Sequence, residues 1–327
     1  MVVATAPGKV LLAGEYAILA GYPAVVAAVD RRVRATVGGK RPGTSPFLEA
    51  VRATLAARLG PDAPEVRAAS RISVESDALG RRGKKLGLGS SAAVTTAAVA
   101  AALGPNVPQA MIHALAHEAH GAAQAPRGAR GSGADIVACV YGGVRRVHAI
   151  PPTPEAPHPP LAHAPLVWPK SLPLVLLWTG APADTPTLVA AVKRFAAANP
   201  AAHAAAVAGL GAVAEGLSRV LAPGVTPDPA RVIALVDDGA RAIARLGADA
   251  GTALVPPGFD ALAVEARALG GAAKPTGAGG GDLVLVVLPS PDAVPLLLAA
   301  ARPLGLSPVG ASIDLAGVRV AGQPDPA

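Results

Sequence analysis

The chain has 327 residues, enough for one large domain or two ordinary ones, and 51% of them are hydrophobic. Only 2% are aromatic, so the core must consist of Ala, Val and Leu. The formal net charge of +7 favours an anionic partner. Because the cations are scattered and do not interleave with aromatics, a phosphorylated small molecule fits better than nucleic acid.

Strands and helices alternate irregularly in the first half of the chain. β-branched and alternating segments predict strands, while Ser45 is placed to cap a helix. The predicted strands are Val2–Thr5 and Val10–Ala13 around a turn in "APGK", one or two within Ala24–Val37, and Arg71–Ser76. The predicted helices are Ser45–Leu59, a buried one at Ser90–Leu103, and Pro108–Ala123. A polar loop is expected at Asp77–Lys85, and "ADIVACVYGGVRRVHAI" predicts a helix or strand followed by a strand.

Residues 151–173, "PPTPEAPHPPLAHAPLVWPKSLP", form the clearest composition break. Their prolines forbid a helix or an inner strand, which leaves an interdomain linker or a loop closing the first domain. We therefore expect an N-terminal unit at 1–165 and a C-terminal unit at 166–327. Beyond the break, "LVLLWTG" predicts a buried strand. Helices are expected at Thr185–Ala198, Ala201–Leu221, Pro229–Leu246, Phe259–Leu269 and Ala293–Ala301, and strands at Leu283–Leu288, Ser307–Ile313 and Gly317–Val320.

Cys139 is the single cysteine, which excludes an internal disulfide and suits a reducing cytoplasm. It lies in an apolar run and is expected to be a core residue. The N-terminus does not have the pattern of a signal peptide, and no uninterrupted strongly apolar stretch reaches the ~18 residues of a membrane span. We expect a soluble cytoplasmic protein without a membrane or nucleic-acid partner.

The stretch "KKLGLGSSAA", Lys84–Ala93, has the composition of a phosphate cradle. The first amides of a helix point at an anion, glycines let the backbone approach it, and the lysines add charge. A glycine turn with a serine cap on an ordinary helix explains the same letters. A P-loop is excluded because G-x-x-x-x-G-K-[ST] is absent. A Rossmann site is disfavoured because no strand runs directly into the glycines and no acid follows about 20 residues on.

Three other segments carry weak signals of their own. In "APGKVLLAGEY", Lys9 is either catalytic or solvated; in "GSGADIVACVYGG", Asp135 is either catalytic or a helix cap. The run "KPTGAGGGD", Lys274–Asp282, packs four glycines into five residues, a cost in backbone entropy that a plain turn does not need.

These four segments, in this order, resemble the motifs of the GHMP kinases. The resemblance implies an α+β fold of two lobes, the N-terminal one like domain 2 of ribosomal protein S5 and the C-terminal one ferredoxin-like, with the active site between them. It implies ATP and Mg²⁺ as cofactors. The residues it assigns to ATP are Lys85, Gly87, Leu88, Gly89, Ser90, Ser91 and Ala92.

The same resemblance implies catalytic roles for Asp135, which would receive or orient the acceptor's proton, and for Lys9 beside it. Ser91 would ligate Mg²⁺, with a second ligand from Glu118, our first choice, or Gln124. The residues assigned to the acceptor are Glu15, Tyr16, Ser132, Gly133, Arg145, Thr179, Thr185, Lys274, Gly277, Gly279, Gly280 and Asp282. Arg145 and Arg146 could equally form a solvated strand edge.

Within the family the segments are most similar to the phosphomevalonate kinase branch, through "GEY", "GSGADIVACVYGG", "WTGAPADTPTLV" and the terminal Asp282. The implied reaction is transfer of the γ-phosphate of ATP to 5-phosphomevalonate in the mevalonate pathway of isoprenoid synthesis. Three departures leave mevalonate or another small alcohol open as acceptor. Asp184 stands where serine is usual, the stretch Gln124–Arg130 is long, and the chain is somewhat short.

Other hypotheses remain from different classes. His113, His117 and His120 share one helix face, which could suggest zinc, but no cysteine or acid cluster completes a site. Nothing in the sequence supports a place for His117 or His120 at the active site. A non-catalytic ligand sensor on this fold is expected to lose Asp135 or Lys9, and an RNA-binding protein to bind with a steep salt dependence. A monomer or a homodimer is expected.

Overall fold

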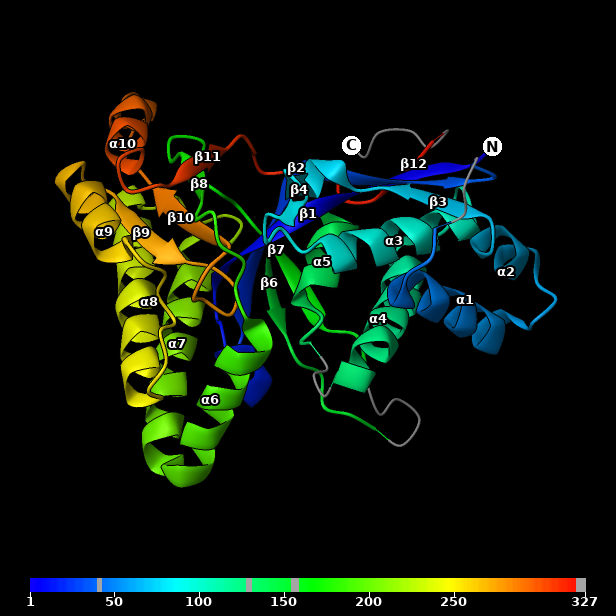
Figure 1. Cartoon of the computed structure of the whole chain (residues 1–327), viewed down its shortest axis with the longest axis horizontal. Helices are drawn as coiled ribbons and strands as arrows, with labels where there is room; N and C mark the ends of the chain where they lie inside the picture. Colours follow the sequence, from blue (N-terminus) through cyan, green and yellow to red (C-terminus); the bar gives the residue numbers. More distant parts are fainter. Residues whose placement is uncertain (40–42, 128–130, 154–158, 322–327) are drawn as a thin grey trace.

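A computed structural model describes residues 1–39, 43–127, 131–153 and 159–321. It has two lobes side by side, each with its own antiparallel sheet (Figure 1). The largest hydrophobic cluster runs from the first lobe to Leu176, Val213 and Leu285 of the second. Alanine, valine and leucine make up most of this cluster, as the low aromatic content predicts.

The first sheet has the strand order β12-β1-β2-β6-β7, with β3 also paired to β2. Its strands are β1 (Val3–Ala13), β2 (Ala24–Val37), β3 (Ile72–Glu75), β6 (Val144–His148), β7 (Ala162–Leu166) and β12 (Arg319–Val320). The segment 24–37, for which one or two strands were open, is a single strand.

The turn predicted in "APGK" is wrong, because β1 passes through it as one strand. The pairing with β2 shifts register between Pro7 and Gly8, a bulge that accommodates a residue without an N–H. At the bulge the amide of Lys9 donates to the carbonyl of Leu88 at 2.9 Å. A Cβ on Gly8 would lie 2.9 Å from that carbonyl oxygen, so the glycine lets the loop before residue 90 rest on β1.

Helices cover one face of this sheet (Figure 1). They are α1 (Pro46–Leu59), α2 (Pro64–Ala69), α3 (Ser90–Leu103), α4 (Gln109–Gln124) and α5 (Ala134–Tyr141). The predicted cap of α1 is confirmed, since the Ser45 side chain accepts from the amide of Leu48 at 3.3 Å. The expected loop at Asp77–Lys85 contains a small hairpin of β4 (Gly80–Arg81) and β5 (Lys84–Lys85). Short 3-10 helices lie at Ala17–Ala20, Asp77–Leu79, Ala125–Arg127 and Pro291–Ala293.

The proline-rich segment belongs to the first lobe. It contributes β7, an edge strand paired only to β6, which is where prolines are tolerated. Residues 154–158 of this segment, and 128–130 of the lengthened stretch Gln124–Arg130, lie outside the described residues. The expected boundary at residue 165 falls within β7.

The second sheet has the order β11-β8-β10-β9 and is antiparallel throughout. Its strands are β8 (Leu174–Trp178), β9 (Ala272–Pro275), β10 (Leu283–Val287) and β11 (Ser307–Val309). The helices are α6 (Thr185–Ala198), α7 (Pro200–Val220), α8 (Pro229–Asp249), α9 (Phe259–Ala268) and α10 (Val294–Ala301). Strand β9 was not predicted, because the four residues "AAKP" carry no periodicity.

Helix α7 is long and apolar enough to cross a membrane by length and composition alone, the one such helix in the described ranges. Its Val207, Leu210 and Leu217 are buried in the protein. The core helix of a soluble protein passes the same test, so this finding does not indicate a membrane span.

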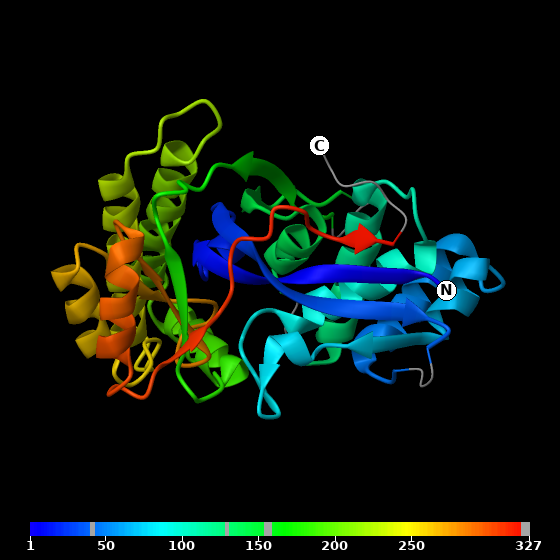
Figure 2. The same cartoon turned by 90° about the horizontal axis from the view of Figure 1, so that it is seen from above.

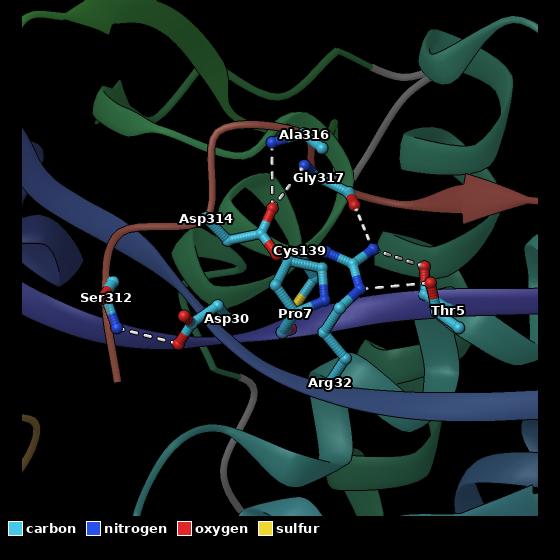
Figure 3. Close-up of polar contacts among 9 residues, drawn as sticks. All are labelled: Thr5, Pro7, Asp30, Arg32, Cys139, Ser312, Asp314, Ala316 and Gly317. Atoms are coloured by element: carbon cyan, nitrogen blue, oxygen red, sulfur yellow. Dashed lines mark hydrogen bonds and ion pairs between the residues drawn. The ribbon is translucent and has the colours of Figure 1, made fainter. Parts of the chain in front are cut away.

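After β11 the chain crosses back from the second lobe to the first, where β12 pairs with β1 (Figure 2). Asp314 anchors this crossing: its carboxylate pairs with Arg32 and accepts from the amides of Ala316 at 2.9 Å and Gly317 at 3.1 Å (Figure 3). Asp30 adds a bond from the amide of Ser312 at 2.8 Å. The C-terminal segment therefore fastens the two lobes together.

Candidate active site

The loop from Gly87 to Ala92 opens helix α3 beneath β1. Gly89 occupies the cap position in the left-handed region (φ 71°), and no side chain in the described part of the chain caps the helix. The predicted serine cap is therefore wrong, and the first amides of α3 are left to bind an anion. A Cβ on Gly89 would lie 2.8 Å from two carbons of Lys9, so the glycine is what admits the lysine beside the loop.

Asp282 lies against the same loop from the second lobe. A Cβ on Gly87 would come within 2.5 Å of the Asp282 Cβ. Burial raises the pKa of Asp282. A hydrogen bond from the backbone of Ala183 and the charges of Lys9 and Lys85 lower this pKa. The loop 87–92, Lys9, Lys85 and Asp282, predicted from three separate motifs, are thus brought together.

Asp135 stands in the first turn of α5, with Gly133 (φ 86°) at the cap position. One turn further on, the buried Cys139 thiol donates to the carbonyl of Pro7 at 3.1 Å, which docks α5 on β1 two residues before Lys9 (Figure 3). Burial raises the pKa of the Cys139 thiol, and Asp135 and Lys9 act on it with opposite signs. Lys9 and Asp135, the two residues predicted to be catalytic, therefore both lie near the contact between Cys139 of α5 and Pro7 of β1.

His120, on α4, lies between Asp135 and the loop 87–92. Its Nε2 atom lies 3.1 Å from Ser91 Oγ and 4.0 Å from Asp135 Oδ2. The sequence predicts that His120 lies on a helix face but does not predict which residues pack against it. That information was absent because Ser91 and Asp135 reach the histidine from two other helices.

Glu118, our first choice as second metal ligand, points elsewhere. It pairs with Arg58 of α1 at 2.9 Å, on the exposed side of α4. Two residues along a helix turn the side chain by about 200°, so Glu118 and His120 cannot face the same site. Gln124, the other choice, contacts His120 at 3.4 Å. Among the described residues no group of three or more His, Cys, Asp or Glu could hold a metal, so the zinc hypothesis fails there.

Three residues assigned to the acceptor join the two lobes instead. Lys274 is fully buried and forms an ion pair with Glu15, which is 2% exposed. Burial lowers the pKa of Lys274, against the attraction of Glu15. The Tyr16 hydroxyl donates to the carbonyl of Ala278 at 2.7 Å. These contacts join Glu15 and Tyr16 of the first lobe to the second lobe.

Arg145 is also placed away from Asp135. It donates to the carbonyls of Gly142 and Tyr141, both at 2.9 Å, at the opposite end of α5. Its neighbour Arg146 pairs with Glu215 of α7 at 3.3 Å. The phosphate-gripping role considered for these arginines is not supported, and Arg145 instead caps a helix.

The remaining acceptor candidates lie on the second lobe's side and at the start of α5. The amide of Thr179 donates to the carbonyl of Asp282 at 2.9 Å, and Thr185 is the exposed first residue of α6. Asp184 caps α6 by accepting from the amide of Thr187 at 3.3 Å.

In the glycine run, a Cβ on Gly279 would lie 2.1 Å from the Leu254 carbonyl, and one on Gly280 would lie 2.7 Å from a Leu188 methyl. Gly277 has nothing within 4 Å of a Cβ, and Ser132 accepts from the amide of Ala134 at 3.3 Å.

His113, two turns before His120, gives the protein a specific pH dependence. Burial, with smaller effects of His117 and His163, lowers its pKa to about 3. The unfolded chain takes up the proton near pH 6.5, so stability is lost as the pH falls from about 6.5 towards 3, by up to about 1.4 kcal/mol per pH unit. Urea unfolding of wild type and His113→Gln between pH 7 and 5 should show the steeper loss in wild type. Parallel curves would contradict a neutral buried His113.

Comparison with known proteins agrees with this geometry. Residues 47–143 match the family described as GHMP kinases N terminal domain. The chain is 31% identical over 347 aligned positions to a phosphomevalonate kinase of Streptomyces sp. (strain CL190), covering 88% of this chain and 90% of the relative. The phosphomevalonate kinase of Streptococcus pneumoniae, solved with phosphomevalonate and AMPPNP, superposes over 96% of this chain and all of its own, with a TM-score of 0.77 at 19% identity. The mevalonate kinase of Methanococcus jannaschii follows with a TM-score of 0.70 at 15% identity over 96% and 98% of the two chains. The two-lobe kinase fold is confirmed, and the chain belongs to the GHMP kinase family.

Proposed function

We propose that the protein transfers the γ-phosphate of ATP to 5-phosphomevalonate, giving 5-diphosphomevalonate. The observation that carries the proposal is the meeting of Lys9, Ser91 and Asp135 at the uncapped start of α3. The Streptomyces relative supports the choice of acceptor. A sensor that had lost catalysis is disfavoured, since both Lys9 and Asp135 are present and positioned.

Phosphoryl transfer depends on positioning and on neutralising charge more than on covalent chemistry. The amides of Ser90, Ser91 and Ala92 bind phosphate oxygens at the start of α3. Lys9 and Lys85 supply full positive charges near the loop, and Asp135 orients the attacking oxygen. Since the second pKa of a phosphate monoester is about 6, the acceptor is largely ionised at neutral pH and needs only weak base assistance.

The residues present fit a magnesium ion. Mg²⁺ keeps several of its waters and binds through one or two protein oxygens together with substrate phosphates. Ser91 Oγ and the Asp135 carboxylate, both close to His120 Nε2, are such oxygens. When bound, the metal neutralises charge on the phosphates. We propose Ser91 as its ligand, leave Asp135 to the attacking oxygen, and propose no role for Glu118.

We place the enzyme in the cytoplasm as a monomer or homodimer, with a phosphorylated small molecule as its partner and neither nucleic acid nor a membrane. The single buried cysteine and the low aromatic content, 2%, support this placement.

Because Asp184 caps α6, we expect replacing it with serine to have only a small effect on kinetics. Serine caps a helix about as well as aspartate, so Asp184→Ser should leave α6 intact. The KM for 5-phosphomevalonate should change less than about tenfold, or 1.4 kcal/mol. Steady-state kinetics with 5-phosphomevalonate and with mevalonate measures this KM and the preference between the two acceptors. A switch of the preferred acceptor to mevalonate would show that Asp184 sets specificity.

The proposal as a whole is tested by ADP release with five acceptors: mevalonate, 5-phosphomevalonate, 5-diphosphomevalonate, homoserine and galactose. We expect 5-phosphomevalonate to give the highest kcat/KM. If mevalonate is turned over faster, the protein is a mevalonate kinase on the same fold.

A further inference from the structure

The ring of His120 is held rigidly at the centre of the site. It is 2% exposed and stacks on Phe47, with ring centroids 5.4 Å apart and an interplanar angle of 24°. Three polar groups approach its Nε2 atom: Ser91 Oγ at 3.1 Å, the Gln124 amide at 3.4 Å and, beyond hydrogen-bond distance, Asp135 Oδ2 at 4.0 Å.

The orientation of Gln124 determines which of these groups donates. Its Oε1 atom accepts from the amide of Gly131 at 2.8 Å, so its NH₂ group is the end that faces His120. An amide NH₂ can only donate. An NH₂ group facing Nε2 favours the tautomer in which Nε2 is the acceptor and the ring proton is on Nδ1.

The Ser91 hydroxyl has one proton and two lone pairs. Nε2 has a single lone pair, and Ser91 Oγ at 3.1 Å is nearer to it than the Gln124 amide at 3.4 Å, so the hydroxyl is the group that donates its proton to His120. Both lone pairs of Ser91 Oγ then point away from the ring. A hydroxyl oriented this way presents only acceptor density to a cation, without first having to rotate its proton aside.

We propose that His120 is a positioning residue that fixes the Ser91 hydroxyl in its metal-binding orientation, with Gln124 and Gly131 setting the tautomer. This inference rests on the proposed role of Ser91 as a magnesium ligand. His120 itself does not touch the metal, so its contribution passes entirely through Ser91.

A matched pair of substitutions separates this role from simple packing. In His120→Gln the side chain can place an acceptor oxygen near the former Nε2, whereas in His120→Asn it reaches only the Nδ1 position. The readout is Mn²⁺ affinity by electron paramagnetic resonance with a non-hydrolysable ATP analogue, which requires no acceptor and no turnover.

We expect His120→Asn to weaken Mn²⁺ binding at least fivefold and His120→Gln to stay within twofold of wild type. In the Ser91→Ala background, His120→Asn should have no further effect, because coupled residues are non-additive. His113→Asn, a buried histidine of the same helix that does not contact Ser91, controls for loss of packing and should keep wild-type Mn²⁺ affinity.

The outcomes distinguish the metal role of Ser91 from the positioning role of His120. If Ser91→Ala leaves Mn²⁺ affinity unchanged, the metal role in the proposed function is wrong and the inference falls with it. If Ser91→Ala weakens binding but His120→Asn adds an equal loss in that background, His120 acts independently and the inference alone is overturned.

A measurement on the wild-type chain avoids variants that fail to fold. ¹⁵N-labelled histidines report the protonation of each ring nitrogen, and the His120 signal is assigned by its absence in His120→Gln. We expect Nδ1 to carry the proton and Nε2 to be bare. A proton on Nε2 would overturn the inference, since the ring would then donate to Ser91.

Discussion

Replacing Asp135 with alanine is expected to lower kcat by about a thousandfold, the range of a lost proton-transfer or orienting group. ATP affinity should change less than about tenfold, or 1.4 kcal/mol, because the phosphates bind the start of α3 rather than α5. Asp135 also lies 4.0 Å from His120 and not within the loop 87–92. Turnover and nucleotide binding are measured separately, by ADP release and by calorimetry.

Asp184→Ser serves as the control for Asp135→Ala, since it also alters an acidic residue at the start of a helix but should keep its turnover. Asp135→Asn preserves the shape of the side chain and isolates the effect of charge. Residual turnover above about a tenth of wild type in Asp135→Ala would remove this carboxylate from the mechanism.

Breaking the buried pair between the lobes is expected to give the largest loss of stability. Lys274→Met leaves the carboxylate of Glu15 buried without its cation, which costs about 3–5 kcal/mol in other proteins. The double variant Glu15→Leu/Lys274→Met removes both charges and should recover most of that loss. Urea unfolding at neutral pH measures each variant.

The exposed pair of Arg58 and Glu118 provides the control, since such pairs contribute about 0–1 kcal/mol. This experiment also decides between two roles for Lys274. If Lys274→Met keeps wild-type stability and loses only affinity for the acceptor, the residue binds substrate, as its motif implied, and does not join the lobes.

Helices and long strands were predictable from the sequence because their signals are local. The cap at Ser45, the small residues of Ser90–Leu103 and the β-branched run Ala24–Val37 each determine their own segment. The strand β9 and the return of β12 to the first sheet were not predictable. Both depend on partners far along the chain, such as Ala4 and Val320.

The candidate site divides in the same way. Lys9, the loop 87–92 and Asp135 lie in motifs that a single sequence can show. The second ligand and the acceptor residues could not be settled, because the faces of α4 and α5 are known only once they are packed. The packing pairs Lys274 with Glu15 and Glu118 with Arg58, contacts that no local pattern indicates, and it places His120 beside Ser91.

The most direct test of the account follows the reaction of ATP and 5-phosphomevalonate by ³¹P nuclear magnetic resonance. Transfer to the acceptor's phosphate creates a P–O–P linkage, so we expect two doublets split by phosphorus–phosphorus coupling in addition to those of ADP, absent with Asp135→Ala. A new uncoupled monoester signal, or reaction with mevalonate alone, would show that the enzyme phosphorylates an alcohol and would contradict the proposed function.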